Sequence, residues 1–598
     1  MTPGIPPADT EREFMKTPKV WAALTAGAVA LSLGLTACGG GDDGDSDSSG
    51  LKFDAGTNGI VNPSDKKGGT LKVGMSDDFD STDPGDTYYA FGNNFIRLYT
   101  RTLMTYTSQP GAAGLKPSPD LAEAPGVPSD DNKTWTFKLK KGLKYEDGTE
   151  IKAEHIKYAV ARTYDRGVLG HGPAYFPQLL DADGYKGPYK DKNLDNFKGI
   201  ETPDDYTLIF KLKEPFPEFN ELVTFSGQTA PVPPDKDKGA QYRLRPLSSG
   251  PYKWEGNYQP KKGGVLVRNE HWDPSTDPNR KALPDRIEVI AGIEANEVDN
   301  RLMNGELHVD LAGSGVQDAA RQKILTNPDL KAKADNPLAG FHWYIPINLK
   351  TIPNLECRKA IVYAADRDAM WRAYGGDVGG ERATSIQPPN IAGRQKGTDF
   401  YTSTAPGYKG DVDKAKEALQ KCGKPDGFST TMVYRSDRPK EKAVAEALEQ
   451  SLARVGIKLT LKGYPAGTYT GEQLGSPSFV KKENIGLGTY GWAPDWPTGY
   501  GYLQALTDGK AIVEAGNTNV SELDDPEINK LWNDVVKITD AAEREKIYNR
   551  IDEKARELAA ILPNVYAKSL LYRPETLTNV YFHQGFGMYD YANLGVTG

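Results

Sequence analysis

Alternating apolar and polar positions predict short strands in the first half of the chain. The clearest are residues 134–140 (TWTFKLK) and 206–213 (YTLIFKLK), where every second side chain is apolar, as in a strand with one buried face. Residues 68–75 follow a Gly-Gly turn, and residues 286–292 have the same strand character. Residues 248–273 predict a hairpin, because the turn sequence Lys-Lys-Gly-Gly separates two strand-like runs.

Apolar residues at helical spacing predict several helices. In chain order these are residues 90–105, 151–165, 296–307, 357–374, 411–421 and 440–456. Further strands are predicted at 341–348, 429–435 and 457–464, so that the last helix joins two strands in a strand-helix-strand unit. Hairpins combined with such units indicate an α/β or α+β fold.

The N-terminal segment has the pattern of an export signal. Lys16 and Lys19 precede an apolar run at 20–35, which is too short to span a bilayer comfortably. The sequence LTAC, which ends at Cys38, resembles a bacterial lipobox. This resemblance implies cleavage before Cys38 and a diacylglycerol anchor on its thiol.

A polar stretch follows the predicted anchor. Residues 39–50 are rich in glycine, serine and aspartate and cannot bury a core. We therefore predict a signal peptide over 1–37 and a flexible tether over 38–60. The alternatives are an uncleaved transmembrane anchor and a secretory signal with a coincidental cysteine. Met15 begins a more conventional signal than Met1 does, so the start site stays open.

Composition places the mature chain among globular proteins with more than one lobe. About 560 residues are too many for one hydrophobic core, so two or three lobes are expected. The net charge of -8, without a basic stripe, argues against nucleic-acid binding, which needs clustered lysine and arginine. Most of the 31 tyrosines and nine tryptophans are expected to pack in cores or on the surface, and the remainder suits a wide ligand cleft.

Two cysteines remain beyond the predicted anchor. Outside the cell membrane the environment is oxidising, so we predict a disulfide between Cys357 and Cys422. It would close a loop of about 65 residues and stabilise the fold by roughly 4 kcal/mol in the chain-entropy model. The alternative is two buried, unpaired thiols, because each cysteine lies at the end of a predicted helix.

The order of the motifs resembles that of a known family. The segments that carry the resemblance are GGTLKVGM (68–75), PDLAEAPGVPSDDNKTWTFKLKKGLKYEDGTEIKAEHIKYAVAR (119–162), ETPDDYTLIFKLKEPFPEF (201–219), SSGPYKW (248–254), CRKAIVYAADRD (357–368) and GTYGWAPDWP (488–497). In this order they look like the family 5 extracellular solute-binding proteins, the peptide-, oligosaccharide- and nickel-binding receptors of ABC importers. The match covers nearly the whole mature chain and is specific to the family, although not to a ligand.

The resemblance implies an α/β, periplasmic-binding-protein-like fold of the cluster C type, with two main lobes and an inserted smaller β-rich lobe. Lobe I is expected to be discontinuous, from 61–110, 230–335 and 565–598. The inserted sub-lobe is expected at 111–229 and lobe II at 336–564. The two halves would close on a ligand by hinge motion.

The segment GWAPDW contains the sharpest candidates for ligand binding, Gly491, Trp492 and Asp495. In peptide-binding members of the family, the aspartate of a matching W-x-x-D segment pairs with the α-ammonium group of the peptide, and the resemblance implies this role for Asp495. A desolvated ammonium needs a counter-charge, and a charge-assisted hydrogen bond contributes about 1.5 to 3 kcal/mol. The alternative is that Asp495 caps a turn before Pro497.

Two residues next to this aspartate depart from the usual pattern of the family. Pro494 removes a backbone donor directly before Asp495, and Trp496 replaces a smaller residue. Both substitutions leave the detailed geometry of the ligand open.

Other candidates are weaker. Ser81 and Thr82 follow the first strand, where loops commonly face a cleft, but turn formation explains them equally well. Trp343 and Tyr344 are neighbours on a predicted strand, so alternation sends only one of them toward the ligand. We favour Trp343, with core packing as the alternative.

The sequence gives no sign of an enzyme. Its six histidines lack metal-ligand spacing, and no G-x-S-x-G motif occurs. We therefore expect no catalytic residue, no metal and no cofactor.

The sequence as a whole predicts a monomeric, lipid-anchored solute-binding protein on the extracellular face of the cell membrane, in a Gram-positive bacterium. It would capture an oligopeptide-like ligand between its lobes and deliver it to an ABC permease. The alternatives are an oligosaccharide or another small solute as the ligand, or a receptor for a peptide signal.

Overall fold

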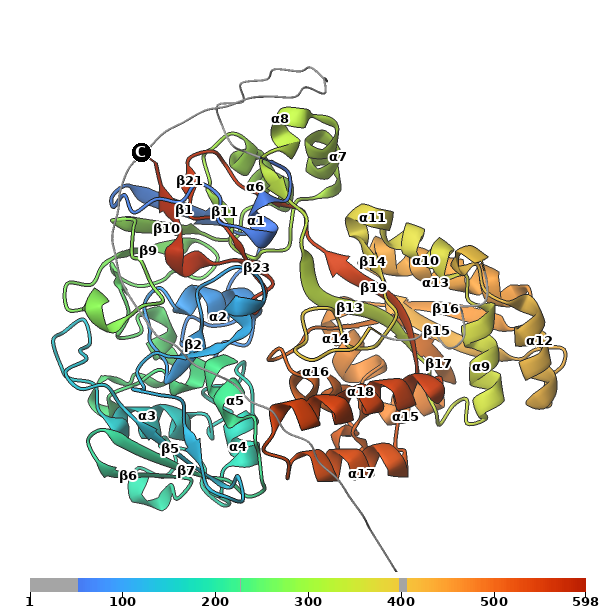
Figure 1. Ribbon diagram of the computed structural model, residues 1–598, viewed down its shortest axis with the longest axis horizontal. Coiled ribbons are helices and arrows are strands. Elements are labelled where there is room, and N and C mark those ends of the chain that lie inside the picture. The colour runs from blue at the N-terminus through green and yellow to red at the C-terminus, as the bar shows by residue number, and fades with distance from the viewer. Residues whose placement is uncertain (1–51, 226, 397–405, 598) are drawn as a thin grey trace, which may run out of the picture. The chain divides into compact units, whose positions relative to one another are not determined.

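The first sheet combines strands from distant parts of the sequence. The computed structural model describes residues 52–225, 227–396 and 406–597 (Figure 1). The strands lie in the order β11, β1, β10, β9 and β8, with the bounds Val309–Asp310, Thr70–Gly74, Arg286–Ile290, Gly263–Arg268 and Tyr252–Trp254. Strand β1 is parallel to β10 and β11, whereas β9 is antiparallel to β8 and β10. These strands confirm the predictions at 68–75 and 286–292 and the hairpin within 248–273.

A second sheet lies within the predicted inserted segment. Its antiparallel strands are β4, β5, β7 and β6, with the bounds Val127–Pro128, Thr134–Lys138, Thr207–Lys211 and Ile200–Asp204. The apolar residues of β5 and β7 that alternate with polar ones are buried against α3 (Ala153–Arg162), α4 (Tyr175–Leu179) and α5 (Phe219–Phe225). The alternation that predicted these strands therefore reflects one face packed on helices.

Two more sheets occupy the C-terminal half of the chain. In the antiparallel sheet the order is β14, β19, β13 and β18, with the bounds Gly380–Arg382, Ile561–Lys568, Leu338–Pro346 and Tyr490–Trp492. In the parallel sheet the order is β16, β15 and β17, with the bounds Lys458–Tyr464, Ser429–Arg435 and Ile485–Gly488. Helix α13 (Pro439–Ala453) connects β15 to β16, which confirms the predicted strand-helix-strand unit. Strand β19 runs through residue 564, where lobe II was predicted to end.

Helix α2 is shorter than its apolar spacing predicts. It spans Ala90–Ile96 instead of 90–105, because the chain turns and then forms β2 (Met104–Tyr106), which pairs with β3 (Pro117–Pro119). Arg101 accounts for this turn. Its backbone N–H donates to Ser249 and its buried guanidinium donates to Asp120 at 2.6 Å, contacts that a continuing helix would not provide.

The helix predicted at 357–374 is two helices, α9 (Leu355–Ala364) and α10 (Arg367–Tyr374). Asp366 separates them, because its side chain accepts the backbone N–H of Ala369 at 2.8 Å. Aspartate competes with the helical backbone in this way and favours the start of a new helix.

The other elements complete the fold (Figure 1). The remaining α-helices are α1 (Ala55–Asn58), α6 (Ala295–Met303), α7 (Asp318–Thr326), α8 (Pro328–Lys331), α11 (Gly376–Gly379), α12 (Val412–Lys421), α14 (Ala466–Thr468), α15 (Pro477–Lys482), α16 (Gly499–Thr507), α17 (Pro526–Val535) and α18 (Ala541–Glu557). Short strand pairs join β12 (Ala334–Asp335) to β20 (Leu571–Tyr572), β21 (Leu577–Thr578) to β24 (Gly595–Val596), and β22 (Phe582–His583) to β23 (Met588–Tyr589).

The predicted tether ends earlier than expected. Residues 55–58, within the predicted range 38–60, form α1, and the backbone N–H of Gly56 donates to buried Asp335 at 2.8 Å. The predicted signal peptide, its cleavage site and the anchor cysteine Cys38 lie outside the described residues. In the part of the chain that the structure describes, no helix is long and apolar enough to cross a membrane.

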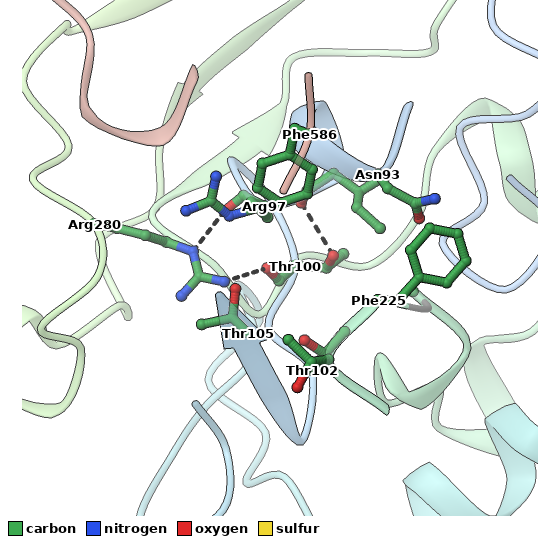
Figure 2. Close-up of a pocket in the computed structure, with 11 residues that line it drawn as sticks. Asn93, Arg97, Thr100, Thr102, Thr105, Phe225, Arg280 and Phe586 are labelled. Carbon is green, nitrogen blue, oxygen red and sulfur yellow. Dashed lines mark hydrogen bonds between the residues drawn. The ribbon is translucent and has the colours of Figure 1, made fainter. Parts of the chain in front are cut away.

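A small pocket of about 10 Å³, with room for about one water molecule, lies beside α2 (Figure 2). It is lined by Asn93, Ile96, Arg97, Thr100, Thr102, Thr105, Thr224, Phe225, Gly227, Arg280 and Phe586. Both arginines are matched by buried aspartates, Arg97 by Asp590 and Arg280 by Asp120 and Asp277. The pocket therefore has no unmatched positive charge of its own.

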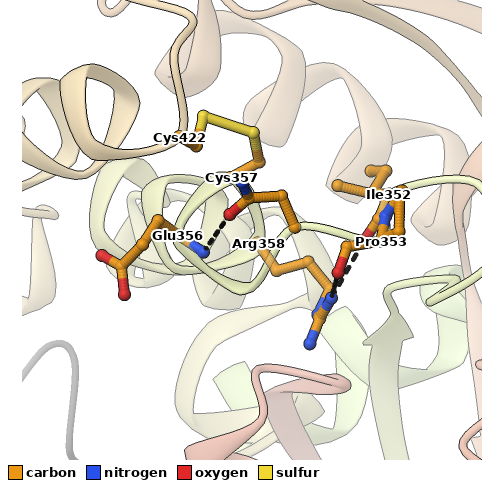
Figure 3. Close-up of a disulfide and its surroundings, with 7 residues drawn as sticks. Ile352, Pro353, Glu356, Cys357, Arg358 and Cys422 are labelled. Atoms are coloured by element: carbon orange, nitrogen blue, oxygen red, sulfur yellow. Dashed lines mark hydrogen bonds between the residues drawn. A yellow bond between two sulfur atoms is a disulfide. The ribbon is translucent and has the colours of Figure 1, made fainter.

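Cys357 on α9 and Cys422 at the end of α12 are joined by a disulfide (Figure 3). This is the pair expected from the sequence, and the Cα atoms lie 5.4 Å apart. The two helices also pack through a cluster of apolar residues that includes Ala360, Ile361 and Leu419. The bond therefore reinforces an interface that is already apolar.

Replacing both Cys357 and Cys422 by serine should lower the free energy of unfolding by up to roughly 4 kcal/mol, because the unfolded chain regains the freedom of a 65-residue loop. Urea unfolding of the two proteins measures the difference. As a control, a reductant should destabilise the wild type and leave the double variant unchanged. Equal stability of the variant and the oxidised wild type would contradict the prediction.

Candidate functional site

The candidate residues Gly491 and Trp343 lie opposite each other on neighbouring strands. Strand β18 pairs with β13 so that Trp343 faces Gly491, and a Cβ atom at Gly491 would lie only 2.3 Å from Cε3 of Trp343. The glycine is therefore required by the indole that covers it. This packing accounts for Gly491 without any contact to a ligand.

Trp343 lies on the more open face of this sheet. The Trp343 ring stacks on the Phe341 ring, with the two ring centroids 6.0 Å apart. The guanidinium of Arg435, a residue of β15, lies 4.9 Å from the centroid of the Trp343 ring. Phe341 is 41% exposed, whereas Tyr344 is buried. Alternation thus places Trp343, and not Tyr344, on a partly exposed aromatic surface.

Trp492 points to the opposite face. It pairs in register with buried His342, and its ring stacks on Tyr490 with centroids 6.3 Å apart. Its indole N–H is buried and has no hydrogen-bond partner among the described residues. Trp343 and Trp492 therefore do not form one aromatic wall.

Asp495 follows β18, and its carboxylate accepts hydrogen bonds from two tyrosine hydroxyls that come from distant parts of the chain. The Tyr88 hydroxyl donates to Oδ1 at 2.8 Å, and the Tyr175 hydroxyl donates to Oδ2. The backbone N–H of Asp495 donates to the carbonyl of Gly501 at 3.0 Å. The carboxylate is thus engaged by side chains, which argues against the alternative that Asp495 caps a turn before Pro497.

The environment of Asp495 is unfavourable for a bare negative charge. Burial raises its pKa to about 6, although the hydrogen bonds from Tyr175 and Tyr88 oppose the shift. Among the described residues, no lysine or arginine forms an ion pair with Asp495. Burial and the charge of Asp495 raise the pKa of Tyr175, which therefore stays protonated and remains a donor. The site can accept a cation that the protein itself does not supply.

Ser81 and Thr82 are buried and satisfied within the protein. The Ser81 hydroxyl accepts the backbone N–H of Asp83 at 3.1 Å, and the Thr82 hydroxyl donates to the carbonyl of Arg243. Each residue is only 3% exposed. These contacts favour turn formation over ligand contact for both residues.

Trp496 is buried against the segment 111–229. Its indole N–H donates to Glu218 at 2.7 Å, and the same carboxylate accepts Thr498 at 2.5 Å and Tyr548 at 2.7 Å. Its ring packs against Tyr175, Phe216 and Tyr500. The tryptophan that departs from the family pattern therefore joins two distant segments directly beside Asp495.

Three of these partners, Tyr88, Tyr175 and Glu218, were not predicted from the sequence. Glu218 lies in the segment 201–219 that carried the family resemblance, so its position could have drawn attention. The tyrosines lie 407 and 320 positions from Asp495, and no local spacing connects them to it. Nor do the described residues include a group of three histidine, cysteine or acidic side chains arranged to hold a metal ion.

Comparison with solved structures identifies the class of the fold. The chain is similar to the structure described as "Clavulanic acid biosynthesis oligopeptide binding protein 2", with a TM-score of 0.88 and 40% sequence identity. The match covers 92% of this chain and 99% of that one. The fold is that of the periplasmic peptide-binding proteins.

The family model for bacterial extracellular solute-binding proteins, family 5 (middle region), matches residues 116–513. The chain belongs to this family, which confirms the resemblance noted from its motifs. It is 26% identical to di/tripeptide-binding protein 1 of Pseudomonas aeruginosa (strain UCBPP-PA14), over 85% of this chain and 91% of that protein. It is 25% identical to the glutathione-binding protein GsiB of Escherichia coli O6:K15:H31 (strain 536 / UPEC), over 79% of this chain and 85% of that protein. These relatives are solute-binding proteins and not enzymes.

Replacing Trp496 by phenylalanine should lower the free energy of unfolding by about 1 to 3 kcal/mol, because one donor to the buried Glu218 carboxylate is lost. Urea unfolding without ligand measures this change. Trp492→Phe is the matched control, since its indole N–H has no partner among the described residues. The prediction fails if the two variants are destabilised equally.

Proposed function

We propose that the chain is the substrate-binding lipoprotein of an ABC importer, which captures an oligopeptide-like ligand and delivers it to a membrane permease. In this proposal Cys38 carries the lipid anchor on the outer face of the membrane of a Gram-positive bacterium. The protein acts as a monomer and does no covalent chemistry. The lobe division predicted from the sequence, with closure by hinge motion, belongs to the same proposal.

The observation that carries the proposal is the state of Asp495. Its carboxylate is desolvated and receives two hydroxyl groups, yet among the described residues it has no cationic partner. A carboxylate offers about four acceptor positions, and an ammonium group has three donors. The α-ammonium group of a peptide can therefore bind Asp495 while both tyrosines keep their hydrogen bonds.

The half-exposed aromatic surface supports a ligand with extended contacts. Phe341 and Trp343 stack in parallel, and Arg435 lies over the indole while its Nε donates to Glu441 at 2.8 Å. Such a surface offers stacking and apolar contact with limited demand for a particular side chain. The family relatives with di- and tripeptide or glutathione in their names fit a ligand of this kind.

Replacing Asp495 by asparagine should weaken the binding of a free-amine tetrapeptide by about 10- to 100-fold, because one charge-assisted interaction is lost. Isothermal titration calorimetry measures both dissociation constants. As a control, the same peptide with an acetylated amino terminus should bind the wild type weakly. The substitution should not weaken the binding of this acetylated peptide further. Unchanged affinity in the variant would show that Asp495 does not bind the ammonium, and preferential binding of an oligosaccharide would reject the peptide.

Peptide affinity should fall as the pH drops below about 6. The pKa of Asp495 is raised to about 6 in the free protein, and a bound ammonium would lower it, so binding at pH 6 releases a proton. Below that pKa the protonated carboxyl must ionise before it binds, and affinity falls toward tenfold per pH unit. Titrations between pH 4.5 and 7.5 test this. Asp495→Asn should lack the dependence, and a wild type without it would contradict the assignment.

A further inference from the structure

Lys440 is a partly buried lysine without an anionic partner. It is the second residue of α13, and its ammonium forms neither an ion pair nor a hydrogen bond with a described residue. This ammonium is not one of the buried, unpartnered polar atoms of the described chain, so it keeps access to solvent. The ammonium of Lys442, in contrast, lies 3.5 Å from the carboxylate of Glu446. Because the helix dipole disfavours a positive charge in the first turn, Lys440 is not stabilised by its own helix either.

The ammonium of Lys440 lies over an aromatic surface that is partly exposed. It is 5.3 Å from the centroid of the Tyr374 ring on α10, and that centroid lies 6.3 Å from the centroid of the Trp343 ring. Trp343 stacks in turn on Phe341, which is 41% exposed. An aromatic ring attracts an ammonium through its π face and leaves the positive charge uncancelled. A group from solution that contacts these rings therefore meets a free positive charge at their edge.

The other cation on this surface is already matched within the protein. Arg435 lies over the Trp343 ring, and its Nε atom donates to Glu441 at 2.8 Å. Glu441 is 5% exposed and also accepts the Thr489 hydroxyl at 2.7 Å. The positive charge of Arg435 is thus used to stabilise a buried carboxylate. Of the two described cations that lie over these rings, Lys440 is the one left to pair with an anion from outside.

The charges around Lys440 favour a bound anion. Burial lowers its pKa, and the positive charge of Arg321, on α7, lowers it further, whereas the charge of Asp318 opposes the shift. Arg321 forms an ion pair with Asp318, whose side chain is 85% exposed, and water and salt weaken an exposed pair of this kind. One exposed carboxylate thus faces two cations. A second carboxylate beside Lys440 would offset both its desolvation and its repulsion by Arg321.

We infer that Lys440 binds a carboxylate group of the ligand, so that the protein selects zwitterionic ligands over ligands that carry an ammonium group alone. The inference rests on the proposed binding of the α-ammonium group by Asp495. Trp343 connects the two positions, because it covers Gly491, four residues before Asp495, and packs beside Tyr374. A peptide supplies the carboxylate at its C-terminus or on an acidic side chain, whereas a neutral oligosaccharide has none. Lys440 is then the residue that determines specificity for the anionic group.

Calorimetry with pairs of peptides tests the inference. Alanine peptides of two to six residues are compared with their C-terminal amides at pH 7, because the distance from Asp495 to Lys440 sets the length at which the carboxylate reaches the lysine. At that length the wild type should bind the acid at least about tenfold more tightly than the amide. In Lys440→Gln the ratio of the two dissociation constants should fall to about one. It should be kept in Lys442→Gln, a control that removes an exposed charge of the same sign from the same helix.

A further peptide and a further variant identify the source of the carboxylate and the role of the charge. The amide of an alanine peptide that ends in glutamate carries its carboxylate on a side chain alone. Binding as tight as that of the free acid shows that the site accepts an acidic side chain, and binding as weak as that of the alanine amide shows that it takes the C-terminus. In either case the preference must depend on Lys440. Lys440→Arg keeps a positive charge that can stack on the Tyr374 ring and should retain most of the preference.

The outcomes separate this inference from the proposed function. Equal affinity of the wild type for acid and amide at every length, with binding that still depends on Asp495, would overturn the role of Lys440 and leave peptide capture intact. A preference for the acid that survives in Lys440→Gln would overturn it as well. Binding of no peptide would reject the proposed function and the inference together. If Lys440→Gln fails to fold, Lys440→Met takes its place, because it keeps an unbranched apolar stem beside Tyr374 and lacks only the charge.

Discussion

The structure depends on how two carboxylates that are removed from water obtain their hydrogen bonds. A buried carboxylate costs several kcal/mol unless donors replace its hydration. Glu218 meets this requirement with the indole of Trp496, the hydroxyls of Thr498 and Tyr548, and nearby Arg544. Its donors come from residues 278 to 330 positions further along the chain, so satisfying this one group joins the segment 111–229 to the C-terminal half.

Asp495 meets the same requirement only in part. Two tyrosine hydroxyls donate to it, and the raised pKa reflects the remaining cost of its charge. The two carboxylates therefore differ in the role that we assign to them, one in the fold and one in the proposed binding of a ligand. Glu218 uses its acceptor positions for the fold, whereas in the proposed function Asp495 keeps positions for a group from outside. Trp496, adjacent to Asp495, donates to Glu218 and so fixes the loop that carries Asp495.

Local pattern predicted the elements better than it predicted the contacts between them. Alternation located β5 and β7, because one face of each strand packs on helices. Alternation also favoured Trp343 over Tyr344 as the candidate for ligand contact. The apolar spacing of 90–105 was misleading, because buried contacts of Arg101 turn the chain after α2. In residues 357–374 the apolar residues keep helical spacing across Asp366, but capping by Asp366 starts a second helix there.

The candidate site was predictable only at a residue that lies within a recognisable sequence motif. Asp495 was found through the resemblance of its motif, but its partners Tyr88 and Tyr175 come from segments with no pattern that points to it. Ser81 and Thr82 were plausible by position and are instead consumed by internal hydrogen bonds. Gly491 was predicted as a ligand-binding residue, but the structure explains the glycine by packing, since the indole of Trp343 occupies the space of a side chain. Pairings over hundreds of residues follow from the whole fold, which local sequence does not encode.

The use of tyrosine as the donor to Asp495 has a consequence for selectivity. A lysine or arginine in place of Tyr88 or Tyr175 would neutralise the carboxylate and leave no electrostatic reason to bind a cationic ligand. A hydroxyl stabilises the charge without cancelling it, so the site keeps its attraction for an ammonium group while the empty protein tolerates the buried carboxyl. Hydroxyl donors also leave acceptor positions open, because each supplies one proton to a group with about four sites. In the proposed function, the same carboxylate is therefore held in place before binding and remains available to the ligand.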